Sequence, residues 1–150
     1  NLISDETVFL APSPYTTITL PGDSPSPITV GAYNHLNNSI YIHSGRGYTI
    51  GGLIKPDLAA PGVDIVTARR GGGYEAVTGT SFAAPFVTGS AALLMQWGIL
   101  QGNDPFLYGE KVKAYFTRGA RHLPGYDVWP NERLGYGTLC VRDSLPLGNS

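Results

Sequence analysis

The chain has 150 residues, a net charge of -1 from ten basic and eleven acidic side chains, and 42% apolar residues. This composition supports a packed core and excludes an extensively disordered chain. The balanced charge gives no electrostatic footprint for nucleic acid or for an anionic membrane. One cysteine, Cys140, excludes an internal disulfide framework and a thiolate zinc cluster.

These observations predict that the chain uses no metal, no cofactor and no nucleic acid. No uninterrupted apolar stretch reaches the roughly 18 residues of a membrane span, so we also expect no membrane partner. The chain begins at Asn1 and its only methionine is Met95. Residues 1–5 have neither the basic nor the apolar region of a signal peptide. Because translation begins with methionine, we expect the chain to be cut from a longer protein.

The first predicted elements are extended. Residues 1–27 are predicted to be an extended segment, because five prolines fall between residues 12 and 27 around an alternating Thr/Ile/Leu run. Residues 28–33 are β-branched and apolar, which predicts a buried strand, and 40–42 predict a short strand after a turn. Residues 45–62 are punctuated by glycine and proline, and we expect irregular backbone there.

The second half of the chain changes character. Short strands are predicted at 63–68 and 74–77, on either side of a flexible loop. Residues 81–100 are apolar nearly all round, which predicts a helix buried in the middle of the protein. A second, amphipathic helix is predicted at 108–118, with Val112, Tyr115 and Phe116 as its apolar stripe, and a short strand near 138–141. Strands followed by a buried helix indicate an α/β architecture with part of the sheet missing.

One stretch carries the chemistry: Gly79-Thr80-Ser81-Phe82-Ala83-Ala84-Pro85. It places Ser81 where a glycine turn meets the start of the buried helix. Such a position exposes the hydroxyl and sets the Ser81 N–H among the unpaired amides of a helix N-terminus, which suits a developing oxyanion. Pro85 is expected in the first turn, where its missing N–H costs little. Serine is also a favoured capping residue, so Ser81 as a simple N-cap is the alternative.

This stretch resembles the catalytic-serine signature of the subtilisin-like serine proteases, G-T-S-x-A-x-P. Further blocks resemble the same family in the same order. They are Ile28-Thr29-Val30-Gly31-Ala32, Ser44-Gly45-Arg46-Gly47, Lys55-Pro56-Asp57-Leu58-Ala59-Ala60-Pro61-Gly62, and Gly135-Tyr136-Gly137. The resemblance implies an α/β fold: the C-terminal portion of a three-layer αβα domain, with a mostly parallel sheet and a buried central helix that starts at the catalytic serine.

The stretches 9–19 and 96–99 resemble a clostridial branch of this family that includes the Csp spore-germination proteases. Members of that branch carry an insertion upstream of this region. The resemblance therefore implies that 1–150 is the C-terminal part of a catalytic domain and that 1–27 follows such an insertion. It also suggests a secreted or spore-associated protein.

The resemblance implies a role for four residues. Ser81 would be the nucleophile, with its backbone N–H as one oxyanion donor, and the Thr80 hydroxyl would support that oxyanion hole. Thr78 and Gly79 would line the substrate groove. The family writes Asn or Ser where this chain has Thr78, a departure that can alter contacts with the substrate.

A serine needs a base and an orienting carboxylate before it is a good nucleophile. The family's Asp-Thr-Gly, His-Gly-Thr-His and oxyanion-asparagine motifs are absent from these 150 residues. Asp5 or Asp23 with His35 or His43 have the right chain order, but both histidines fall in predicted loops. We therefore expect the isolated chain to be inactive and the missing groups to come from the upstream half of the same catalytic domain.

Three functions follow as hypotheses. The first is a serine endopeptidase acting on protein or peptide substrates through an acyl-enzyme at Ser81. The second is a pseudoprotease with a regulatory or structural role, for example in spore germination, because members of the branch have lost triad residues. The third, an α/β-hydrolase esterase, fails at Ala83 of the G-x-S-x-G motif and would need His122 with Asp104, Asp127 or Asp143. The low charge content, 14%, predicts apolar surface that a partner covers, or self-association of the chain.

Overall fold

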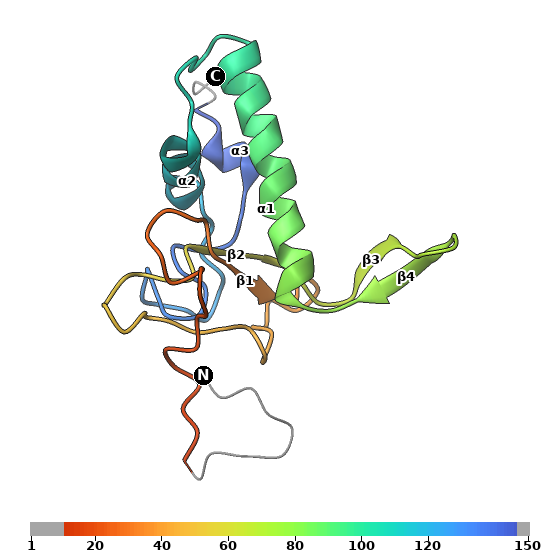
Figure 1. Cartoon of the computed structure of the whole chain (residues 1–150), viewed down its shortest axis with the longest axis vertical. Coiled ribbons are helices and arrows are strands. Elements are labelled where there is room, and N and C mark those ends of the chain that lie inside the picture. Colours follow the sequence, from red (N-terminus) through yellow and green to blue (C-terminus); the bar gives the residue numbers. More distant parts are fainter. Residues whose placement is uncertain (1–10, 147–150) are drawn as a thin grey trace.

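The computed structural model describes residues 11–146 and shows a mixed α/β arrangement (Figure 1). A parallel pair of strands lies under a long helix, and an antiparallel hairpin projects to one side. The elements in chain order are β1 (Val30–Tyr33), β2 (Leu58–Pro61), β3 (Ile65–Ala68), β4 (Tyr74–Val77), α1 (Thr80–Met95), the π-helical turn η1 (Gln96–Leu100), α2 (Gly109–Arg118) and α3 (Val141–Ser144). The predicted α/β class, with a parallel sheet and a central helix, is confirmed.

The parallel pair is formed by β1 and β2, in a register that places Val30 opposite Leu58. We expected irregular backbone at β2, and that prediction is wrong. Except for Pro61, the last residue of the strand, the glycines and prolines lie outside it, and three of its four residues, Leu58, Ala59 and Ala60, are fully buried. A strand buried on both faces shows no alternation of apolar and polar residues, so only its short apolar run marks it.

The outer edge of β1 is partly closed by its own chain. The Ala32 N–H donates to the Ser44 hydroxyl over 3.0 Å, and the Ala32 carbonyl accepts from the Tyr41 N–H over 3.1 Å. The strand predicted at 40–42 is reduced to a single antiparallel bridge between Tyr33 and Ile40. The loop after β1 therefore supplies the groups that a neighbouring strand would otherwise supply.

The hairpin β3–β4 confirms the two strands predicted around the glycine-rich loop. Ile65 pairs with Val77, and Ala68 pairs with Tyr74. The hairpin extends away from the rest of the protein, and Figure 1 shows it as an arm on the right.

The long helix confirms the predicted position but not the predicted burial. Four of the sixteen residues of α1 are buried, and they recur at helical spacing on one face: Ala83, Val87, Ser90 and Leu94. Outside this stripe α1 exposes large apolar side chains, among them Phe86 and Leu93. The described residues supply one protein layer against α1, and the apolar opposite face has none.

The 21 residues from Thr80 to Leu100 are long and apolar enough to cross a membrane by length and composition alone. The central helix of a layered soluble domain meets the same criterion, because it is apolar on every side.

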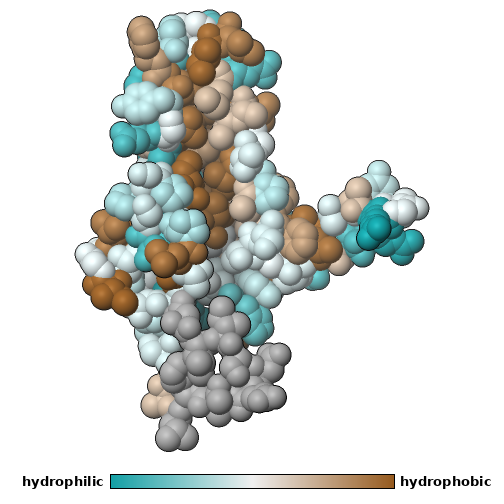
Figure 2. Space-filling view, viewed as in Figure 1, coloured by the Kyte–Doolittle hydropathy of each residue, from teal (hydrophilic) through white to brown (hydrophobic). Residues whose placement is uncertain are grey.

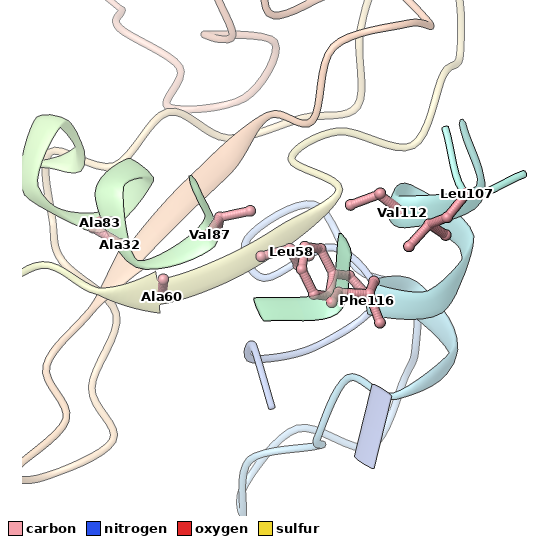
Figure 3. Close-up of a cluster of buried hydrophobic side chains, with 9 residues drawn as sticks. Ala32, Leu58, Ala60, Ala83, Val87, Leu107, Val112 and Phe116 are labelled. Carbon is pink, nitrogen blue, oxygen red and sulfur yellow. The ribbon is translucent and has the colours of Figure 1, made fainter. Parts of the chain in front are cut away.

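The core lies between α1, the parallel pair and α2 (Figure 3). In that view Val87 of α1 lies above β2 between Ala60 and Leu58, and Phe116 of α2 lies beside Leu58. The amphipathic stripe predicted for α2 is confirmed: Val112 and Phe116 are buried, and Tyr115 is half-buried with its ring edge against Trp97. The strand predicted near 138–141 is limited to bridges at Thr138, and the residues from Val141 form the short helix α3.

A buried ion network ties α2 to the start of β2. The Asp57 carboxylate accepts from the Lys55 ammonium over 2.7 Å and from the Lys113 ammonium over 2.6 Å. It also accepts from the Thr29 N–H over 2.7 Å. The Lys55 ammonium donates in addition to the Pro27 carbonyl. Burial lowers the pKa of Lys55, and its contacts with Asp57 oppose that shift.

Acid is expected to weaken the anchoring of α2. The hydrogen bond from Lys111 lowers the pKa of Asp104, with a further contribution from the Tyr115 hydroxyl. The unfolded carboxyl titrates near its ordinary value of about 3.9. A carboxyl whose folded pKa is lower contributes stability above that value and loses it as the pH falls through the folded pKa. Urea unfolding midpoints at pH 6 down to pH 3 measure this loss.

The Asp104→Asn variant is expected to show a flatter pH profile than the wild-type chain over this range. Asp127→Asn is the matched control, because Asp127 is exposed and belongs to none of the ion pairs of residues 11–146. If Asp104→Asn and the wild type lost stability equally on acidification, Asp104 would not be the group responsible.

Candidate active site

Ser81 lies on the first turn of α1, immediately after the turn that leaves β4. Gly79 precedes the helix with φ 156° and ψ 162°, a backbone conformation that is essentially restricted to glycine. The Ser81 side chain is exposed. Among residues 11–146, no hydrogen bond partner is found for its hydroxyl or its N–H. Its hydroxyl and its amide are thus both available to a ligand.

The N-cap alternative for Ser81 is wrong. The N-cap residue of α1 is Gly79, and no side chain of the described residues caps this end of the helix. The expected place of Pro85 also changes: it is the sixth residue of α1 and lies in the second turn, inside the helix. Because proline has no N–H, the Ser81 carbonyl lacks its usual i+4 donor. The first turn therefore leaves the Ser81 carbonyl without its regular i+4 hydrogen bond.

The turn before Ser81 packs directly on the ends of the two parallel strands. The Gly79 N–H donates to the Gly62 carbonyl over 2.8 Å. A Cβ at Gly62 would lie 2.7 Å from the Ala32 Cβ and 2.9 Å from the Gly79 carbonyl oxygen, so the close approach requires glycine. Since β1 ends at Tyr33 and β2 at Pro61, Ser81 is anchored at the carboxyl edge of the parallel pair, where ligands of α/β proteins bind.

Thr78 and Thr80 flank Gly79 and have different surroundings. The Thr78 hydroxyl accepts from the Asp64 N–H over 3.0 Å, which closes the base of the hairpin. Thr80 is half-buried and borders a cavity of about 580 Å³. The cavity is also bordered by residues of three other segments: Thr19, Gly22, Val30 and His43. Both threonines and Gly79 are thus grouped around the first turn of α1.

The substitutes considered for the base and carboxylate are not joined to Ser81. His35 and His43 are exposed, and the His43 ring lies edge-on to Tyr41. In the part of the chain that the structure describes, neither histidine forms a hydrogen bond with Ser81 or with an aspartate. Asp23 is half-buried beside a different cavity, and Asp5 lies outside the described residues. Residues 11–146 contain no cluster of three or more His, Cys, Asp or Glu that could hold a metal ion.

The histidine and two of the aspartates that an esterase triad would need form other contacts. Asp104 binds Lys111 beyond the end of η1, and the 21 helical residues from Thr80 to Leu100 span about 30 Å. Asp143 binds Arg121. The His122 ring is stacked on Trp129 with centroids 4.4 Å apart. This arrangement gives no support to an α/β-hydrolase triad.

The chain was compared with known families and proteins. The profile of the Subtilase family (peptidase S8) matches residues 12–137. The serine protease AprX of Bacillus subtilis (strain 168) is 32% identical over 153 aligned positions, which cover 87% of this chain and 32% of AprX.

Among solved structures, the CspB protease of Clostridium perfringens superposes with a TM-score of 0.87 at 46% identity, covering 92% of this chain and 30% of CspB. The PatG macrocyclase, solved in complex with a peptide, superposes with a TM-score of 0.69 at 29% identity, covering 83% of this chain and 36% of PatG. The chain thus spans about a third of the length of each of these proteins.

Proposed function

The chain belongs to the subtilase family of serine proteases, and on that premise we propose that it is the nucleophile-bearing, C-terminal part of a subtilisin-like catalytic domain. The observation that carries the proposal is the position of Ser81: exposed, on the first turn of α1, at the carboxyl edge of the parallel pair, with its N–H free. Thr80, Gly79 and Thr78 surround it on one continuous turn.

In the proposed reaction the Ser81 Oγ attacks the carbonyl carbon of a peptide bond, and its proton passes to a histidine supplied by the upstream half. The carbonyl oxygen becomes an oxyanion that accepts a hydrogen bond from the Ser81 N–H, at the positive end of the α1 dipole. The C–N bond then breaks, the leaving amine takes the proton, and Ser81 holds the acyl group as an ester. Water hydrolyses this ester and restores the hydroxyl.

The substrate class is proposed to be a protein or peptide. The cavity beside Thr80 supports this proposal, because it offers room for a side chain within one residue of Ser81. The peptide bound by PatG supports it by relationship. The upstream half is proposed to supply the histidine, the orienting aspartate and the oxyanion asparagine.

The exposed face of α1 is the proposed docking surface for that upstream half. The large apolar side chains exposed along α1 and the adjoining turn η1 are Phe86, Leu93, Met95, Ile99 and Leu100. Figure 2 shows hydrophobic residues running up the body of the molecule in the region of α1. Each relative contains about twice as much further chain as this one, enough for another layer. The same surface supports self-association of the isolated chain.

A fluorophosphonate probe, which esterifies only an activated serine, tests the proposal. We expect no labelling of Ser81 in the 150-residue chain, because base and carboxylate are missing, and stoichiometric labelling once the upstream half is present in the same polypeptide. The Ser81→Ala variant should lose the label, while Ser39→Ala, at another exposed serine, should keep it. A folded complete domain that stays unlabelled would favour the pseudoprotease. Labelling of the 150-residue chain alone would contradict the proposal that the upstream half supplies the histidine and the aspartate.

A further inference from the structure

One face of the β3–β4 hairpin contains only exposed apolar side chains. Cross-strand partners share a face, so the register groups Val66 with Ala76 and Ala68 with Tyr74. All four are exposed, Val66 by 70% and Tyr74 by 79%. On the other face Ile65, Thr67 and Val77 are half-buried, and both Ile65 and Val66 border a small pocket with Phe82 and Phe86 of α1. An exposed apolar sheet face opposite the packed face is typical of a surface that binds a partner.

The β4 residues of this face, Tyr74 and Ala76, also have backbone groups that are not bonded to β3. At the end of the hairpin the Arg69 N–H donates to the Gly73 carbonyl. In an antiparallel ladder the hydrogen-bonded pairs alternate with pairs that are not bonded. The N–H and C=O groups of Tyr74 and Ala76 therefore point away from β3, along the outer edge of β4. Among residues 11–146 no strand pairs with this edge, because the hairpin is a two-stranded sheet.

The tip of the hairpin is positively charged. Arg69 and Arg70 are exposed, and they take part in none of the ion pairs found among residues 11–146. The glycines that follow, Gly71 to Gly73, have no other atoms near enough to crowd a side chain. Figure 2 shows the resulting gradation along the arm, from hydrophobic near its base to hydrophilic at its tip.

We propose that the outer edge of β4 is an exosite that binds an extended segment of a protein substrate. Apolar side chains of the segment lie beside Tyr74 and Ala76, and acidic residues at its C-terminal end lie near Arg69 and Arg70. The segment pairs antiparallel with β4, the commoner arrangement for an added strand.

This assignment rests on the proposed function, because β4 runs from the arginines directly to the turn that contains Ser81. It names a substrate class for that function: proteins in which an acidic, otherwise apolar stretch follows the scissile bond.

Binding of labelled hexapeptides tests the exosite without any catalysis. The probe is fluorescein-labelled Thr-Val-Thr-Val-Glu-Glu amide, and its counterpart carries Lys-Lys in place of Glu-Glu. Fluorescence anisotropy with the 150-residue chain is expected to show saturable binding of the acidic peptide alone, weakened as the ionic strength rises to about 0.5 M. Ser81→Ala should bind it equally well, which separates this result from the role of Ser81.

Three variants locate the binding. Arg69→Glu with Arg70→Glu is expected to weaken it about tenfold, since two exposed ion pairs are replaced by repulsion. Tyr74→Ser should weaken it through lost apolar contact. Arg118→Glu with Arg142→Glu makes the same change of charge at exposed arginines of α2 and α3, and should leave the affinity unchanged.

Equal binding of the Lys-Lys peptide, or equal loss of affinity in the control double variant, would overturn the proposal. So would sedimentation showing a dimer of the chain that the hairpin variants dissociate, because the occupant of the edge would then be a second copy.

Discussion

Asp57→Ala is expected to leave the chain unfolded at neutral pH. The carboxylate of Asp57 is buried and bonded to the ammonium groups of Lys55 and Lys113. Its removal leaves two cations facing each other without a counter-charge and the Thr29 N–H without its acceptor. Breaking a buried ion pair in this way costs about 3–5 kcal/mol. Natural domains are stable by about 5–15 kcal/mol. This loss therefore removes much or all of the folding free energy of a chain in which the long helix α1 is covered on one face.

Circular dichroism with urea titration measures this effect, and Asp143→Ala is the matched control. Asp143 also forms an ion pair, with Arg121, but both side chains are largely exposed. Exposed pairs contribute about 0–1 kcal/mol, so the control should remain folded. Similar unfolding midpoints for the two variants would show that the Asp57 network has no special role in stability.

A pH series on the Asp57→Ala variant gives a second readout. Burial already lowers the pKa of Lys55, and loss of Asp57 removes the contacts that oppose this shift. Between the lowered folded pKa and the ordinary value of about 10.4, the unfolded chain binds more protons than the folded chain. Stability therefore rises with pH in this window, and the variant should regain structure as the solution becomes alkaline.

Gly135→Ala is the second substitution expected to have a large effect. Gly135 has φ +61°, and a Cβ there would lie 2.1 Å from the Pro56 carbonyl oxygen and 2.4 Å from the Asp57 carbonyl oxygen. These are backbone atoms at the start of β2 and cannot rotate away. The turn at Asn131–Gly135 must shift, which also strains the hydrogen bond from the Tyr136 N–H to Asp57. Overpacking and backbone strain together predict a loss of about 3–5 kcal/mol.

Gly125→Ala separates the two causes. Gly125 also has a positive φ, +85°, but nothing lies within 4 Å of a Cβ placed there. This variant experiences the backbone strain alone, expected to cost about 1 kcal/mol. Thermal unfolding of both variants gives the comparison. If Gly135→Ala were no less stable than Gly125→Ala, the close approach to β2 would contribute nothing.

The elements that the sequence predicts well are those with a local signal. Glycine next to an apolar helical run places the start of α1 within one residue, and the 3.6-residue spacing of Val112 and Phe116 identifies the buried face of α2. The strand β2 was missed because Leu58, Ala59 and Ala60 carry no alternation. Such a strand is defined by its neighbours in space, which periodicity does not reveal.

The same contrast between local signals and contacts distant in sequence holds for the site. The motif around Ser81 is local, so its place on a turn before a helix could be predicted, whereas the contact between Gly62 and Gly79 joins segments 17 residues apart. Lys113 gave no signal at all, because its partner Asp57 lies 56 positions earlier. The burial of α1 on all sides was predicted from its apolar composition. Composition shows which faces of a helix are suited to packing, and it does not show which packing partners are present. The structure contains one of those layers.

The Ser44 hydroxyl bonded to Ala32 has a consequence for assembly. Alternate residues of β1 face its outer edge, so Ala32 and Val30 are the two that an incoming strand would meet. Ala32 is already bonded to Ser44 and Tyr41, which leaves Val30 as the open position. An added strand that slides by two residues would find its bonding groups blocked. The outer edge of β1 therefore permits one register of an added strand, and the loop that contains Ser44 prevents pairing in the others.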